Sequence, residues 1–408
     1  MFWYISPVFD RLCQVTIFHT YFSLFFLCGT MHILIAPNAF KNSLDAGNAA
    51  AAINEGLKQS NLNCTTTSFP VGDGGDGTGA LIIQHLNGSL IKVEVNDPLG
   101  RKISSSFGLI DNGETAVIEM ADASGLRLLK SNELNPMHAS SFGTGELIRH
   151  ALDKNAGKII ICIGGSATVD GGTGLLQALG FQFLNKEGNK LTNLPGNLTQ
   201  LDRIELSSID KRILHCELVV LCDVENRLLG NEGAAVVFGP QKGAAPADIK
   251  KLEAALSQLK DVILKETGKD ISLIKHGGAA GGVAAGLSAL LNAQLVNGID
   301  YFLSLTGFDR ELKKADLVIT GEGSIDEQTL QGKGPFGVAE RAKKREIPVI
   351  GIAGRIPLEP SPDLQKWFDV LLPVNHRAMD LTEALSHTRE NIIRTVKTIG
   401  NMLALKKT

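Results

Sequence analysis

Short apolar runs that end in glycine-rich or charged loops recur along this chain, and they constrain its fold more than any other feature. One run, residues 316–320, breaks into Gly321-Glu322-Gly323, and a helical pattern resumes at about Phe336. Runs this brief predict strands rather than helices. The other runs occupy residues 32–36, 158–163, 218–222 and 347–353. Ligands of open α/β sheets bind at the carboxyl ends of the strands, so the sequence predicts an α/β protein with a polar ligand cleft.

The loop that follows residues 316–320 carries chemistry typical of phosphate handling. It holds the carboxylates Glu322 and Asp326 and the ammonium group of Lys333. This mixture suits a phosphorylated ligand held through a metal ion, with the lysine neutralising further charge.

The segment GDGGDG, residues 72–77, fits the dinucleotide pattern G-x-G-x-x-G literally. Asp73 and Asp76 would nevertheless repel a pyrophosphate at that turn. With Mg²⁺ present, the same carboxylates become metal ligands. The alternative is a tight surface turn, because the motif alone is weak.

A Walker A loop is absent, so any phosphate cradle must be built differently. The best candidate is Gly164-Gly165-Ser166-Ala167-Thr168, whose small residues expose backbone N–H groups before a helix. A sterically tight strand-to-helix corner is the alternative. Two further segments have simple structural readings: 239–244 as a solvated turn, and 277–282 as a site of close helix packing.

Composition excludes several classes of function. The 40 basic and 43 acidic residues leave no basic stripe for nucleic acid. No C-x-x-C pair exists, and the cysteines read as buried thiols in a reducing compartment, which predicts a cytoplasmic protein. No Ser-His-Asp order or histidine cluster supports acyl transfer or zinc hydrolysis.

The first thirty residues differ from the rest in being rich in aromatic side chains, such as Phe18, Tyr21 and Phe22. Their apolar stretch is short for a membrane span of about 20 residues, and no cleavage site follows it. We expect residues 1–30 to be a non-native or dispensable extension, with a hydrophobic anchor as the minority alternative. We expect no membrane association otherwise.

The sequence pattern changes in the middle of the chain. Residues 90–120 alternate polar and apolar side chains, as antiparallel strands do. From residue 316 the strand–helix alternation returns, and an apolar stripe from Leu381 to Leu403 predicts one C-terminal helix. A doubly wound domain interrupted by a mixed α/β domain would explain this change.

Taken together, the motifs resemble those of one known family, the bacterial type I glycerate kinases. The resemblance runs from Met31 to about Leu403. It rests on segments that occur in the family's order: 36–44 (APNAFKNSL), 70–78 (PVGDGGDGT), 140–148 (SSFGTGELI), 164–180 (GGSATVDGGTGLLQALG), 239–244 (GPQKGA), 277–287 (GGAAGGVAAGL) and 316–339 (DLVITGEGSIDEQTLQGKGPFGVA).

This resemblance implies ATP-dependent phosphorylation of D-glycerate with Mg²⁺, most often at the 2-hydroxyl, giving 2-phosphoglycerate. It also implies a discontinuous, flavodoxin-like α/β domain at residues 31–95 plus 290–408. A second, mixed α/β domain at residues 96–289 is inserted in it, and the active site lies between the two. The alternatives are a kinase of a related hydroxy acid, such as tartronate or hydroxypyruvate, or a non-catalytic protein that binds sugar acids or nucleotides.

The candidate site residues follow from the motifs and the resemblance together. The γ-phosphate is expected between the Gly164–Thr168 backbone and Lys41. The substrate proton would go to Asp170 or Asp326, and Lys242 and Lys333 are candidates for the glycerate carboxylate or the phosphate. Gln241, Gly281 and Gly282 complete the binding set. The expected Mg²⁺ ligands come from Asp73, Asp76, Asp223 and Glu322.

The chain departs from the family pattern at a few positions. Glu225 stands where Asp is usual, and Ser324 replaces an arginine that could contact phosphate or carboxylate. Asn38 and Asn42 stand where Asp and Gly are common. We expect catalysis to survive these changes, while substrate affinity could differ.

Overall fold

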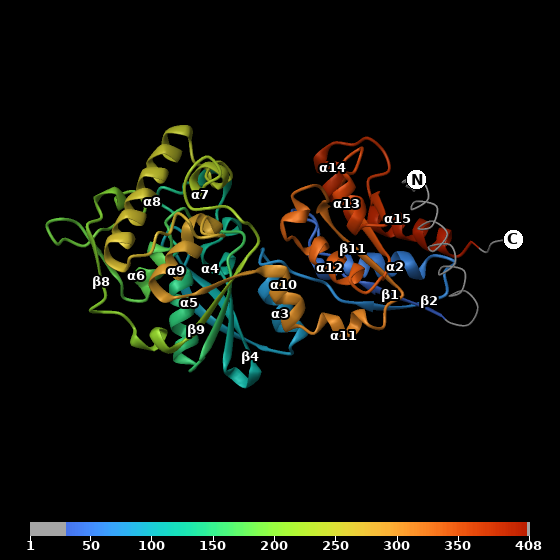
Figure 1. The fold of residues 1–408 in the computed structure, drawn as a ribbon, viewed down its shortest axis with the longest axis horizontal. Helices are drawn as coiled ribbons and strands as arrows, with labels where there is room; N and C mark the ends of the chain where they lie inside the picture. The colour runs from blue at the N-terminus through green and yellow to red at the C-terminus, as the bar shows by residue number, and fades with distance from the viewer. Residues whose placement is uncertain (1–29, 406–408) are drawn as a thin grey trace, which may run out of the picture.

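The computed structural model describes residues 30–405, which form two lobes, each built around a β-sheet (Figure 1). The extension expected at residues 1–30 therefore lies, except for Thr30, outside the described residues. Within the described part of the chain, no helix combines the length and apolarity needed to cross a bilayer.

The first lobe contains a five-stranded sheet in which every neighbouring pair is parallel. Its strands run in the order β13 (Val370–Pro373), β12 (Val349–Arg355), β11 (Leu317–Ser324), β1 (Met31–Ile35) and β2 (Cys64–Ser68). Counted along the chain, this order is 2-1-3-4-5, which reverses direction between β1 and β11. The predicted parallel α/β sheet is thus confirmed.

Helices cover both faces of this sheet, which explains why its central strands are continuous apolar runs. Ile33 and Ile35 of β1 face α2 (Ala46–Lys58) and α15 (Thr388–Leu403). Leu34 faces the opposite side, where α12 (Gly334–Lys343) packs. The prediction of a single helix from Leu381 to Leu403 is wrong. The structure has two helices, α14 (Leu381–Ser386) and α15, separated by His387.

The second lobe contains a six-stranded mixed sheet. Its order is β10 (Gln294–Asn297), β9 (Glu217–Cys222), β6 (Lys158–Cys162), β5 (Thr115–Glu119), β4 (Lys102–Ile110) and β3 (Ser89–Asn96). The first four strands are parallel, whereas β4 and β3 are antiparallel. The antiparallel pairing predicted for residues 90–120 is therefore confirmed.

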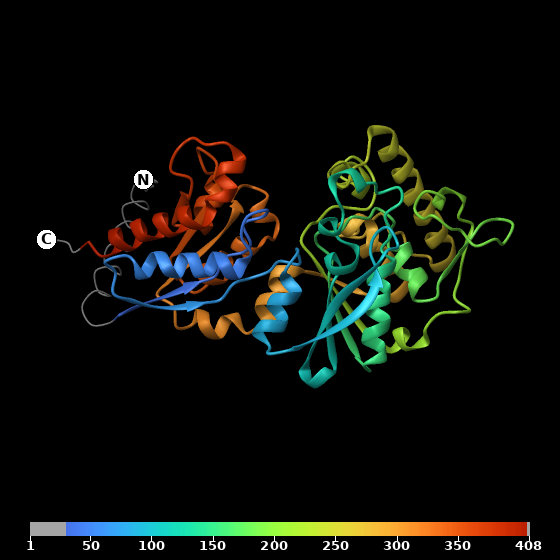
Figure 2. The same ribbon diagram turned by 180° about the vertical axis from the view of Figure 1, so that it is seen from behind.

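One face of the mixed sheet packs against α5 (Phe142–Asp153), α6 (Thr173–Ala178), α8 (Pro246–Thr267) and α9 (Val283–Leu291). The opposite face meets α3 (Thr78–His85) and α10 (Gly298–Leu305). These two helices lie between the sheets (Figures 1 and 2). One hydrophobic cluster there contains residues of both sheets, such as Leu34 and Ile160. The lobes thus share a core.

The chain passes from one sheet to the other twice, between β2 and β3 and between β10 and β11. All of β3 except Asn96 lies within the expected range 31–95, and β10 lies within 290–408, yet both strands pair in the mixed sheet. The remaining elements are short: α4 (Ala121–Ser124), α7 (Ala234–Phe238), α11 (Phe308–Leu312), α13 (Pro362–Trp367), and the two-stranded sheet of β7 (Gln182–Leu184) and β8 (Arg203–Glu205).

Candidate active site

Asp73 lies where the two lobes meet, beside the carboxyl end of β1. Its carboxylate accepts hydrogen bonds from Asn38 Nδ2 at 2.8 Å and from the backbone N–H of Gly334, at the start of α12, at 3.3 Å. The side chain is only 9% exposed. The amide of Asn38 thus orients the neighbouring carboxylate.

Asp223 follows β9 of the mixed sheet and shares this region with residues of the other lobe. Burial raises the pKa of its carboxyl to about 6, the neighbouring Asp73 acts in the same direction, and Lys41 and Lys333 act against it. These charge effects require that the loops after β1, β2 and β9 and the start of α12 converge. The sequence predicted this meeting of strand ends.

Glu322 belongs to the same group of charges. It lies in β11, is buried, and accepts a hydrogen bond from Thr329 Oγ1 at 2.9 Å. Burial raises the pKa of Glu322 to about 7, which Lys333 opposes and Asp73 reinforces. We call Asp73, Asp223 and Glu322 the acidic cluster, and Lys41 and Lys333 its two lysines.

Asp76, the fourth expected metal ligand, stands apart from the acidic cluster. It is exposed, and its carboxylate lies 3.9 Å from Nε of Arg127, which also pairs with Asp122. Arg127 was not found by sequence analysis, because no motif contains it. Within residues 30–405, no three ligand-type side chains lie close enough together to form a metal cage.

The Gly164–Thr168 loop packs directly on the loop of residues 72–77. Gly164 N–H donates to the carbonyl of Gly74 at 3.0 Å, and a Cβ added at Gly164 would lie 2.4 Å from Gly75 Cα. The Ala167 N–H donates to the Ser124 carbonyl. Among the described contacts, the amides of Gly165 and Ser166 have no acceptor, so these two are the N–H groups that could receive a phosphate.

Lys242 supports this loop from inside the protein. Its side chain is 3% exposed, and Nζ donates to Ser166 Oγ at 2.8 Å and to the Thr168 carbonyl at 2.7 Å. Burial lowers its pKa to about 7, against the opposing effect of Asp170 and Asp223. Sequence analysis made Lys242 a candidate to bind the glycerate carboxylate or the phosphate. In the structure its ammonium group donates to the Gly164–Thr168 loop.

The predicted glycine segment 277–282 also supports the loop. Gly281 has φ +67°, and a Cβ there would lie 2.1 Å from the Thr168 carbonyl oxygen. Its own carbonyl accepts from Gly171 N–H at 3.0 Å, and Gly282 has φ +93°. Close packing therefore accounts for both glycines, while Gln241 lies exposed beside Lys242.

The two candidate proton acceptors differ in their surroundings. Asp170 is fully buried, and its carboxylate accepts from the hydroxyl and N–H of Ser141, from Gly172 N–H and from Gly174 N–H. Those bonds tie the starts of α5 and α6 together. Asp326 is partly exposed, accepts from Ser324 Oγ and Gln328 N–H, and raises the pKa of nearby Glu322.

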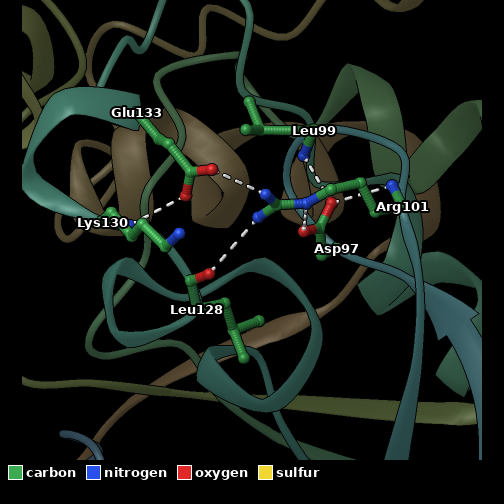
Figure 3. A network of polar contacts seen from close by, with 6 residues as sticks. All are labelled: Asp97, Leu99, Arg101, Leu128, Lys130 and Glu133. Carbon is green, nitrogen blue, oxygen red and sulfur yellow. Dashed lines mark hydrogen bonds and ion pairs between the residues drawn. The ribbon is translucent and has the colours of Figure 1, made fainter.

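A polar network next to the Gly164–Thr168 loop was also missed by sequence analysis. Arg101 Nε donates to the buried carboxylate of Asp97 at 2.5 Å, its Nη1 donates to Glu133 at 2.7 Å, and its Nη2 reaches the Leu128 carbonyl (Figure 3). Glu133 in turn accepts from the N–H of Lys130. The network anchors the segment from which Leu126 N–H donates to the Gly165 carbonyl at 2.9 Å.

The fold and this site define a class: an α/β protein with lysines, carboxylates and two amides without an acceptor where the carboxyl ends of its strands meet. The chain matches the glycerate kinase family over residues 33–404, and it belongs to that family. It is 43% identical to a glycerate kinase of Bacillus subtilis (strain 168), covering 93% of this chain and 99% of that protein.

Two further relatives agree. A glycerate 2-kinase of Escherichia coli (strain K12) is 42% identical, with 92% of this chain and 98% of that protein covered. A crystal structure described as glycerate kinase 2 from Salmonella typhimurium LT2 has a TM-score of 0.77 at 41% identity, covering 92% of this chain and 98% of that one.

Proposed function

We propose that this chain transfers the γ-phosphoryl group of ATP to the 2-hydroxyl of D-glycerate, giving 2-phosphoglycerate and ADP. Family membership and the names of its relatives support glycerate as the acceptor. The observation that carries the proposal is the meeting of the acidic cluster with Lys41 and Lys333 at the carboxyl ends of β1, β11 and β9. Phosphoryl transfer needs this kind of charge stabilisation more than covalent chemistry.

We infer that the lobes are two domains. The five-stranded sheet would form the core of a discontinuous flavodoxin-like domain, which its strand order 2-1-3-4-5 supports. The mixed sheet would form the core of the inserted domain. In a sheet of this order, the ligand site is expected where the order reverses, between β1 and β11, and Lys41 and Glu322 lie at the ends of these strands.

The phosphate end of ATP would lie between Lys41 and the amides of Gly165 and Ser166. Lys41 is exposed, so its ammonium group can reach a ligand, and its lowering effect on the pKa of Asp223 supports a position near the acidic cluster. Lys333 would neutralise the remaining charge of the phosphate or the glycerate carboxylate. Lys242 would act indirectly, by holding Ser166 and Thr168 in place.

The residues present fit Mg²⁺, because carboxylate oxygens are the protein ligands that this ion takes, together with phosphate oxygens and water. Asp223 and Glu322 are the expected ligands, and Asp73, already bonded to Asn38 and Gly334, would orient the site. When bound, the metal neutralises charge that develops on the phosphate oxygens.

Asp326 is the residue that we assign to accept the proton of the substrate hydroxyl. A general base needs a lone pair available to the substrate. The carboxylate of Asp170 is fully buried and already accepts four hydrogen bonds, whereas Asp326 is partly exposed beside Glu322. Asp170 then keeps the starts of α5 and α6 in register.

The test is ATP-dependent ADP release measured with D-glycerate, L-glycerate, tartronate and hydroxypyruvate. We expect kcat/KM to be highest for D-glycerate by at least about tenfold. A higher value for another acid would replace the acceptor, and binding of ATP without turnover of any acid would favour a binding protein instead.

A further inference from the structure

A pocket of about 230 Å³ opens next to the acidic cluster, and the proposed chemistry does not use it. Its walls come from both lobes. Glu225, Lys275, His276 and Asn297 contribute from the mixed-sheet lobe, and Leu330 and Phe336 from the lobe of the five-stranded sheet.

The pocket lies close to the residues that we expect to handle phosphate. Gly332 lines it and directly precedes Lys333, and Glu225 lies two residues after Asp223. Asn297 donates to the Gly332 carbonyl at 3.5 Å. The next residue, Gly298, packs so closely on Asp73 that a Cβ there would lie 2.0 Å from its carbonyl oxygen. A ligand whose phosphates meet the acidic cluster can therefore extend into this pocket.

The charges of the pocket exclude an anionic occupant. Lys275 pairs with Glu225 at 2.7 Å, so its ammonium charge is already balanced, and the carboxylate of Asp300 adds a negative charge to the wall. Neither glycerate nor a phosphate group would find an unbalanced cation here. Carboxylates are, in contrast, good acceptors for ribose hydroxyls.

The rest of the lining suits a planar heterocycle. Ile299, Leu330 and the ring of Phe336 supply apolar surface, and the edge-to-face contact of Phe336 with Trp367, with centroids 5.3 Å apart, fixes that ring. Polar groups for the base edge come from Asn297, Gln331 and His276. His276 Nδ1 lies 2.7 Å from the Val224 carbonyl, so Nδ1 carries the proton and Nε2 is the acceptor of the neutral ring.

We propose that this pocket holds the adenine and ribose of the nucleotide, with Phe336 as the side chain on which the base stacks. The proposal rests on the proposed function only in taking ATP as the phosphoryl donor. It assigns the nucleoside to the α10–α12 side of the lobe junction and leaves the region of Lys41 and the Gly164–Thr168 loop to the phosphates and glycerate.

The experiment compares binding of Mg²⁺–ADP with binding of Mg²⁺–pyrophosphate, by calorimetry, in wild type and variants. Pyrophosphate lacks the nucleoside, so the difference between the two ligands isolates the pocket. Phe336→Ala, and the milder Phe336→Leu, remove the stacking surface, and Gln331→Trp fills the pocket from an exposed position. Lys344→Trp, at the far end of α12, is the matched control.

We expect each pocket variant to bind ADP about tenfold more weakly or worse, as loss of a stacked base does. Pyrophosphate affinity should stay within twofold, and the KM for ATP should rise while the KM for glycerate does not. Equal weakening of ADP and pyrophosphate, unchanged ADP binding, or a rise confined to the glycerate KM would overturn the proposal. A wild type that binds ADP but does not phosphorylate glycerate would instead refute the proposed function, so the two failures are distinguishable.

Discussion

Replacing the buried Lys242 by methionine should change how the stability of the protein depends on pH. Methionine keeps a stem of similar length but lacks the ammonium group that donates to Ser166 Oγ and the Thr168 carbonyl. The pKa of Lys242 falls from 10.5 to about 7 on folding, because burial disfavours the charged form.

The direction of the effect follows from proton binding. Between pH 7 and 10.5 the unfolded chain keeps the lysine proton while the folded protein loses it, so the lysine's contribution to stability rises with pH in this window. Below pH 7 both states are protonated, and the contribution is constant. One pKa unit corresponds to about 1.36 kcal/mol, so two pH units above 7 amount to about 3 kcal/mol.

Urea unfolding of wild type and Lys242→Met, followed by circular dichroism at pH 6 and pH 9, measures this contribution. The free energy of unfolding of the wild type, minus that of the variant, should become more positive by about 3 kcal/mol from pH 6 to pH 9. The same subtraction with Lys344→Met shows what loss of an exposed ammonium group does. A difference that is independent of pH, or that falls as pH rises, would refute the burial argument.

Three further predictions concern the site. Lys41→Ala should lower kcat about 100-fold, or about 2.7 kcal/mol, with an unchanged melting temperature. Lys41→Arg should restore little of the activity, because a planar guanidinium does not replace a compact ammonium group. A Lys41→Ala variant with normal kcat and a lower melting temperature would make Lys41 structural. Excess chelator should abolish turnover and Mg²⁺ should restore it, and undiminished turnover would remove the acidic cluster as a metal site. Gly281→Ala should destabilise the protein by about 2 kcal/mol or more in thermal melts, because its Cβ would meet the Thr168 carbonyl at 2.1 Å. Gly268→Ala, with φ +72° and no atom within 4 Å, controls for backbone strain alone, and equal losses in the two variants would refute the steric argument.

Sequence reasoning identified the strands and the loops at their ends because both are local patterns. Apolar runs such as 158–163 and 316–320 are short, and the polar residues that follow them occupy the carboxyl ends of parallel strands. Their meeting at Asp73, Asp223 and Glu322 follows from the topology of α/β sheets.

The surroundings of individual side chains could not be read from the sequence, because they depend on distant contacts. The donors to Asp170 include Ser141, 29 positions earlier, and Lys242 reaches Ser166, 76 positions earlier. From their motifs, Asp170 was a catalytic candidate and Lys242 a candidate for binding substrate or phosphate. In the structure, Asp170 accepts hydrogen bonds at the starts of α5 and α6, and Lys242 donates to the Gly164–Thr168 loop. Arg127 and the Arg101 network lie outside every motif.

Phosphorylation of D-glycerate at its 2-hydroxyl can be tested by identifying the product made from ATP and D-glycerate. Purified protein, Mg²⁺, ATP and D-glycerate should yield ADP and one phosphoglycerate in equal amounts, and NMR should place the phosphate on the 2-hydroxyl. Phosphate on the 3-hydroxyl would contradict the assigned position. Absence of any phosphoglycerate, under conditions where the protein binds Mg²⁺–ADP, would contradict phosphoryl transfer to glycerate.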